Sequence, residues 1–309
     1  MQQELKGIRR TYNRLGLAML SFMAIYQLLS IPVIVVIAKL GLQRLLQSSW
    51  FHVLMNESIQ CLVAMPVAAL IMRSAHTQTV PLPRRKLPLW QLGRYLLLSL
   101  GLLFLFNLVG TGINELISLA KGSAAGNIVE QSISSYTLAQ NILLTVILAP
   151  LVEELLFRRM IYRCVGCYGT RVYIITSACL FMLMHGNVVQ YPYAFAVGAM
   201  FAWVYLRTGS LATTILLHAL VNFVGGIVPV LGQHFEPLLL AQALLYFFCA
   251  VYTAATAWQT LLRSHLLDGR PLPPAQLPEG GLDAALLNPG MMLFTLASLL
   301  MAGYVILYV

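Results

Sequence analysis

Two adjacent glutamates, Glu153 and Glu154, interrupt a long apolar run. A charged side chain at membrane depth costs about 2.5–3.5 kcal/mol on insertion scales, so it is rarely kept without a role. Neighbouring helical residues point about 100° apart, so the two carboxylates cannot face one spot. Arg158 follows Glu154 by four residues, the favourable order for an ion pair, which leaves Glu153 free to act as a reactive carboxylate. The alternative is a structural ion network without chemistry.

Two of the six histidines lie well inside apolar segments. His185 follows Phe181 by four residues and His218 precedes Asn222 by four, so each pair shares one helix face. A carboxylate with imidazole and amide groups can activate water and stabilise a developing oxyanion. A single membrane histidine is more often a hydrogen bonder between helices, and that alternative stays open for each.

Other polar groups are expected to be structural. Glu57, near Asn56 and Gln60, is placed at the outer end of the second span, at the membrane interface. The CxxC pair Cys164 and Cys167 has no second pair or histidines to complete a zinc site, so plain thiols are expected.

The composition predicts an all-α, polytopic membrane protein with about 8–9 transmembrane helices. The chain has 309 residues, of which 59% are hydrophobic and 9% charged, against about 25% charged residues in soluble proteins. Continuous rather than alternating apolar segments exclude a β-barrel. Windows of about 20 apolar residues fall near 15–39, 51–72, 95–118, 138–162, 172–189, 191–207, 211–231, 238–262 and 289–309.

A single integral-membrane domain over 1–309 is expected, with residues 95–231 as the catalytic core. Residues 74–93 and 120–137 are predicted loops, and 264–288 a cytoplasmic linker before the last helix, because they are rich in Pro, Gly or Ser.

The net charge of +9 is a topology signal. Threading the spans in alternation places 16 of the 19 basic residues on one side, leaving only Lys39, Arg44 and Lys121 for the other. The positive-inside rule makes that side, with the N-terminus, cytoplasmic. The expected partner of this charge is the lipid bilayer, not nucleic acid. Short loops favour a microbial host, and hence a bacterial plasma membrane.

Missing residues exclude two protease classes, aspartyl and HExxH zinc, and disfavour rhomboid-like serine chemistry. Both aspartates, Asp268 and Asp283, fall in the linker, so an intramembrane aspartyl protease is excluded. No HExxH motif for a zinc protease and no GxSxG turn for a serine hydrolase occurs.

The order of three motifs on three predicted spans carries a family resemblance. The motifs are EExxxR at Glu153, FxxxH at Phe181 and HxxxN at His218. In this order they resemble the CPBP (CAAX protease and bacteriocin-processing, Abi) family of intramembrane metalloproteases. The motifs cover about 150–225. The resemblance implies a bundle of about eight helices, a polar cavity open to the cytoplasmic side, and a water-activated endopeptidase.

Carried over to this chain, the resemblance makes Glu153 the general base acting on water. His185 would hold that water or a metal, and His218 and Asn222 would complete the site as ligand and support or as oxyanion donors. Glu154, Arg158 and Phe181 would support them.

The residues leave metal dependence undecided. Glu153, His185 and His218 with one water would satisfy a catalytic zinc ion, which lowers the pKa of its water to about 7. A glutamate-only mechanism is slightly favoured, because the candidate ligands are scattered singly.

The expected function is hydrolysis of a peptide bond in a membrane-associated or prenylated protein or peptide. The alternatives are a catalytically idle membrane scaffold or bacteriocin-immunity protein of the same fold, and a cation or proton transporter. One requirement is geometric: counted inward from Arg158 and Arg171, Glu153 and His185 differ in depth by on the order of 10 Å. They meet only if Arg158 and Arg159 are drawn into the bundle, or if the helix of His185 starts outside the bilayer or tilts.

Overall fold

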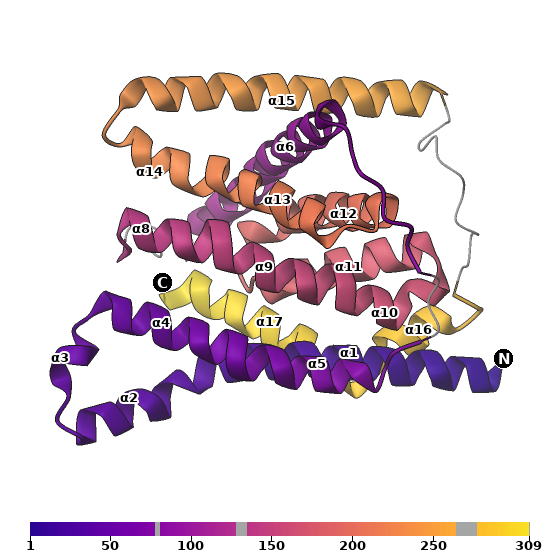
Figure 1. Ribbon diagram of the computed structural model, residues 1–309, viewed down its shortest axis with the longest axis horizontal. Helices are drawn as coiled ribbons and strands as arrows, with labels where there is room; N and C mark the ends of the chain where they lie inside the picture. Colours follow the sequence, from indigo (N-terminus) through magenta and orange to yellow (C-terminus); the bar gives the residue numbers. More distant parts are fainter. Residues whose placement is uncertain (78–80, 128–134, 264–276, 309) are drawn as a thin grey trace.

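The computed structural model describes residues 1–77, 81–127, 135–263 and 277–308. This part of the chain is mostly helical and contains no strand (Figure 1). Seven helical stretches are long and apolar enough to cross a membrane, which confirms an all-α polytopic membrane protein. They are Gln2–Lys39, Ser49–Arg73, Leu89–Lys121, Leu138–Tyr168, Leu211–Gly232, Glu236–Gln259 and Pro289–Tyr308.

Several of these stretches are composite. The first joins α1 (Gln2–Leu28) to α2 (Ser30–Lys39), and α3 (Gln43–Leu46) leads to the second, which comprises α4 (Ser49–Ile59), a π-helical turn and α5 (Met65–Arg73). The fourth contains α8 (Leu138–Asn141), α9 (Ala149–Glu154) and α10 (Ile161–Val165). The remaining elements are α6 (Leu89–Lys121), α13 (Leu211–Asn222), α14 (Val228–Gly232), α15 (Glu236–Arg263), α16 (Gly281–Leu286) and α17 (Pro289–Tyr308).

The two other predicted spans form the central helices α11 (Thr170–Met184) and α12 (Gln190–Thr208). Fifteen residues give α11 a length of about 22 Å, short of the hydrocarbon thickness of about 30 Å. Gly186, with φ of 56°, turns the chain directly after His185, so α12 returns alongside α11. The turn places the end of α11 inside the bundle.

Local sequence explains the boundaries. Thr137 caps α8 through a reciprocal capping box with Gln140. Helix α6 starts at Leu89, directly after Pro88, so it begins earlier than the predicted end of the 74–93 loop. In the predicted linker, residues 264–276 lie outside the described residues, and the rest contains α16.

The bundle has two distinct ends. At one, which we name the basic end, Arg14 Nη1 donates to Ser74 Oγ (2.8 Å), the Thr77 amide to Arg163 O (3.0 Å) and the Arg85 amide to Thr208 O (2.8 Å). The N-terminus, α10 and α16 lie there (Figure 1).

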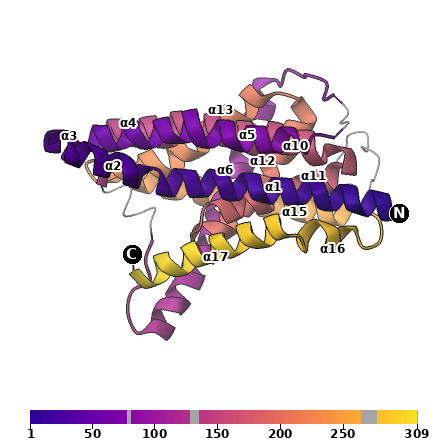
Figure 2. The same ribbon diagram turned by 90° about the horizontal axis from the view of Figure 1, so that it is seen from below.

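The opposite end is formed by α3, the start of α8 and the C-terminal end of α17 (Figure 1). Gln140 Nε2 donates to Ser49 Oγ (2.9 Å), and Lys121 Nζ to Ile306 O (2.7 Å). Helix α17 runs beside α1 (Figure 2). Apart from Arg158, which is buried in the bundle, the described basic residues gather mainly at the basic end, while Lys39, Arg44 and Lys121 belong to the elements of the opposite end.

Close backbone contact fixes α6 against α15. A Cβ added at Gly101 would lie 2.4 Å from Cys249 O, which real Cβ atoms essentially never approach. A Cβ at Gly112, in the same helix, would meet nothing within 4 Å. Only the first glycine is therefore required by packing.

We expect Gly101→Ala to destabilise the protein by about 1–3 kcal/mol, because α6 and α15 must separate to accommodate the methyl group. The readout is the midpoint of thermal unfolding in detergent, followed by size-exclusion chromatography. Gly112→Ala is the matched control, since both changes gain about 1 kcal/mol of helix propensity and only the first meets backbone. Equal midpoints would contradict the proposed contact.

Candidate active site

A buried ion pair anchors the site. Arg158 forms two hydrogen bonds to the Glu154 carboxylate, Nε to Oε2 (3.0 Å) and Nη2 to Oε1 (3.2 Å), and both side chains are 0% exposed. Arg158 Nη1 also donates to Ser177 Oγ (2.8 Å) on α11, and the guanidinium lies 5.0 Å from the Phe181 ring centroid. The pair expected from the i, i+4 spacing is present, and it joins α9 to α11.

His218 on α13 lies between the two glutamates. Its Nδ1 is 2.9 Å from Glu154 Oε1, and its Nε2 is 3.6 Å from Glu153 Oε2. Because a carboxylate only accepts, Nδ1 carries the proton that it donates to Glu154, and this fixes the tautomer. The other ring nitrogen, Nε2, faces Glu153, whose side chain is 28% exposed and lines a cavity.

His185 is held in a similar way. Its Nδ1 lies 2.7 Å from Phe181 O, a carbonyl that can only accept, so Nε2 is free on the cavity side. The rings of Phe181 and His185 meet edge to face, with centroids 4.7 Å apart. The four-residue spacing of Phe181 and His185 thus brings their two rings into contact at the end of α11. Phe181 also contacts His218.

Asn222 compensates for a missing backbone donor. In the π-helical turn Ile142–Leu148, the Ala149 amide donates to Leu144 O, five residues back. The next donor in this register would be Pro150, which has no N–H, so Thr145 O is left for another partner. Asn222 Nδ2 donates to it (2.8 Å), which joins α13 to the turn before the glutamates.

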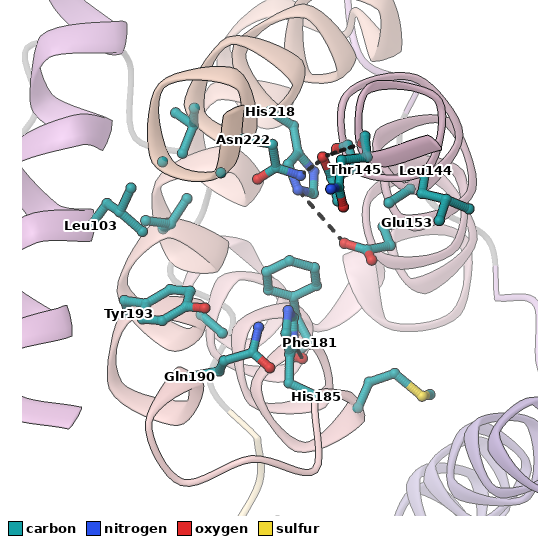
Figure 3. A pocket seen from close by; sticks show the side chains of 18 of the residues that line it. Leu103, Leu144, Thr145, Glu153, Phe181, His185, Gln190, Tyr193, His218 and Asn222 are labelled. Carbon is teal, nitrogen blue, oxygen red and sulfur yellow. Dashed lines mark hydrogen bonds and ion pairs between the residues drawn. The ribbon is translucent and has the colours of Figure 1, made fainter. Parts of the chain in front are cut away.

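These side chains line one cavity of about 760 Å³ (Figure 3). Glu153, His185, His218 and Asn222 converge on it from three separate helical segments. Glu154 and Arg158 are fully buried and are not among the residues that line it. The structure therefore brings together the four predicted catalytic residues, with the predicted supporting residues around them.

The depth requirement is met through Arg158. This arginine is drawn fully into the bundle while Arg159 stays exposed, so Glu153 lies deeper than a count from Arg158 implies. The short helix α11 ends beside it, and His185 reaches the same cavity as Glu153.

Glu57, which the sequence placed at the membrane interface, belongs to the cavity wall. Glu57, Asn56 and Gln60 line the cavity wall together with Tyr26 of α1. Glu57 Oε2 is buried and has no hydrogen-bond partner in the described part of the chain. The π-helical turn Gln60–Ala64 contributes to this placement, since it rotates the residues on either side relative to each other, a shift that residue spacing does not reveal.

The side chains around the cavity determine whether a metal ion could bind there. Each imidazole has its Nδ1 engaged, as in metal-ligating histidines, and Nε2 of His218 faces Glu153. However, no three His, Cys, Asp or Glu side chains among the described residues are grouped so that they could hold a metal ion. Glu153, His185 and His218 therefore do not form the zinc site considered from the sequence in this arrangement.

The fold and site define a polytopic α-helical membrane protein with a glutamate and two oriented histidines in an intramembrane cavity. Residues 135–224 match the family model of the type II CAAX prenyl endopeptidases, Rce1-like. This match contains all three motifs and confirms the resemblance to the CPBP family over that segment. Comparison with curated proteins and with solved structures gives no significant match.

Replacing Arg158 with leucine should be severely destabilising, by about 3–5 kcal/mol, because Glu154 would remain as an uncompensated buried charge. Arg159→Leu is the matched control: it removes the same charge one residue later, from an exposed side chain. We expect folded Arg159→Leu in detergent extracts and little or no folded Arg158→Leu, measured as the monodisperse fraction. Similar folded fractions would show that the buried pair is dispensable.

Proposed function

We propose that this protein is an intramembrane endopeptidase that hydrolyses a peptide bond of a membrane-associated protein or peptide. One observation carries the proposal: the carboxylate of Glu153 borders a cavity and faces His218 Nε2, while Glu154 holds the other ring nitrogen. A base oriented by a partner, which is itself oriented by a buried group, is the arrangement of general-base catalysis. The family match over 135–224 supports the same class of reaction.

In the proposed reaction, Glu153 takes a proton from a water molecule whose oxygen attacks the scissile carbonyl carbon. His185 orients this water by accepting a hydrogen bond at Nε2 from its other O–H, which stays on the oxygen. Asn222 keeps a second N–H beyond the one given to Thr145 O and donates it to the oxyanion. The C–N bond then breaks, and the proton taken by Glu153 passes to the leaving amine, with His218 Nε2 as the adjacent proton carrier. One water is consumed, and a carboxyl and an amine are formed.

A transporter fits the structure poorly. It would require a polar path across both faces of the membrane. Leu156 and Phe157 of the cavity wall, and Ile161 and Val165 that follow them toward the basic end, are at most 1% exposed. This packed layer supports a site that opens in one direction, as an enzyme requires.

We also propose that the N-terminus is cytoplasmic and that the protein spans a bacterial plasma membrane several times. The support is the charge distribution: the basic end carries the cations of the N-terminus, of 84–86 and of α10, and the opposite end carries Lys39, Arg44 and Lys121.

Glu153→Gln should lower cleavage by about 10²–10⁴-fold without loss of folded protein, because it keeps the shape and removes the base. The measurement compares newly formed protein N-termini in membranes that contain wild type or variant. Glu115→Gln is the control, since it removes an acid from an exposed position on α6 outside the cavity. Identical N-termini from folded wild type and Glu153→Gln would instead favour the catalytically idle scaffold.

A glutamate-only mechanism predicts that chelation leaves turnover unchanged. The purified protein is incubated with a strong zinc chelator, and cleavage of a peptide spanning an identified site is measured before and after adding zinc. Metal content by mass spectrometry is the independent readout. Loss of activity that zinc restores, with one bound metal per chain, would replace this mechanism with a zinc-dependent one.

A further inference from the structure

The cavity occupies only one half of the bundle. On α1 it is lined by residues of the last third, such as Tyr26; on α12 by residues of the first turns, such as Gln190; and on α15 by Gln242 near the start. Tyr136 and Asn141, at the start of α8, also line it. All these positions belong to the opposite end, where Lys121 meets the end of α17. The cavity therefore extends from the catalytic residues toward the end that carries few cations.

The half toward the basic end is closed. Directly beneath Glu153 lie the Glu154–Arg158 pair and Ser177, which are 0% exposed. Tyr173, also fully buried, donates from its hydroxyl to Arg158 O (3.1 Å) and packs edge to face on Tyr162. A peptide or a column of water cannot reach Glu153 through this layer without unfolding it.

The uneven distribution of basic residues indicates which end of the bundle faces the cytoplasm. Translocating a loop rich in Lys and Arg is unfavourable, so the end that carries them stays in the cytoplasm. The opposite end then lies on the other side of the membrane, and the cavity with it. This is the reverse of the cytoplasmic opening that the family resemblance implies.

We propose that the active-site cavity opens to the non-cytoplasmic side of the membrane. Taken with the proposed endopeptidase function, on which this part rests, the substrate is a peptide segment of an exported or membrane-anchored polypeptide at the outer leaflet. A prenylated C-terminal tail in the cytoplasm does not have access to Glu153.

The test uses a membrane-impermeant maleimide on intact cells and on permeabilised cells. All variants carry Cys61→Ala and Cys179→Ala, which remove the two half-buried cysteines. Cys164 and Cys249 are buried, so labelling of the exposed Cys167 measures access to the basic end. In the same background with Cys167→Ser, Asn56→Cys reports the cavity and Ser123→Cys, an exposed near-isosteric change, reports the opposite end.

We expect Asn56→Cys and Ser123→Cys to label to similar extents in intact and permeabilised cells. Cys167 should label at least tenfold more after permeabilisation. Labelling of Asn56→Cys only after permeabilisation would overturn the proposal, and so would its failure to label in either state when the protein is folded.

A second measurement needs no cysteine changes. The C-terminal end of α17 lies at the opposite end, so a C-terminal alkaline phosphatase fusion should be active and a green fluorescent protein fusion dark. The reverse pattern overturns the orientation. Neither measurement depends on catalysis. An outward cavity with unchanged N-termini in Glu153→Gln would reject the endopeptidase alone, and an inward cavity with Glu153-dependent cleavage would reject only the direction.

Discussion

The burial of Arg158 with Glu154 is the constraint on which the rest of the site depends. Two charges removed from water are tolerated only when each is fully hydrogen-bonded. Here the guanidinium donates hydrogen bonds to Glu154 and Ser177, and the Glu154 carboxylate also accepts one from His218 Nδ1. The pair thereby fixes α9, α11 and α13 relative to one another. It orients the imidazole that faces Glu153, and it closes the bundle on the basic side.

Departures from regular helix place the remaining groups. Among the described residues, four π-helical turns interrupt the spans: one directly follows Glu154, one directly follows Asn222, and a third ends just before α9, which carries the glutamates. The turn before Pro150 frees a carbonyl that Asn222 binds, so a backbone irregularity in one helix is tied to a side chain of another. Such turns cost helical hydrogen bonds and often mark functional sites.

Much of the fold and the site follows from residue types and spacing. Nine apolar windows became helices because length and hydropathy decide this locally, and the Glu154–Arg158 pair follows from its four-residue spacing. The cavity contact of Glu57 was not predicted, because its neighbours in space come from α1 and α9, and the sequence of one span does not show which helix face meets a cavity. The direction of the cavity likewise depends on how the helices meet, although the charge asymmetry was visible in the sequence.

The cavity wall draws on several segments of the chain. Glu153, the histidines and Asn222 come from the segment that matches the family, whereas Tyr26, Asn56, Glu57 and Gln60 come from helices that precede it, and Gln242 and Met301 from helices that follow it. Exchanging the N-terminal helices between related proteins would therefore change one part of the cavity wall and leave Glu153, the histidines and Asn222 in place.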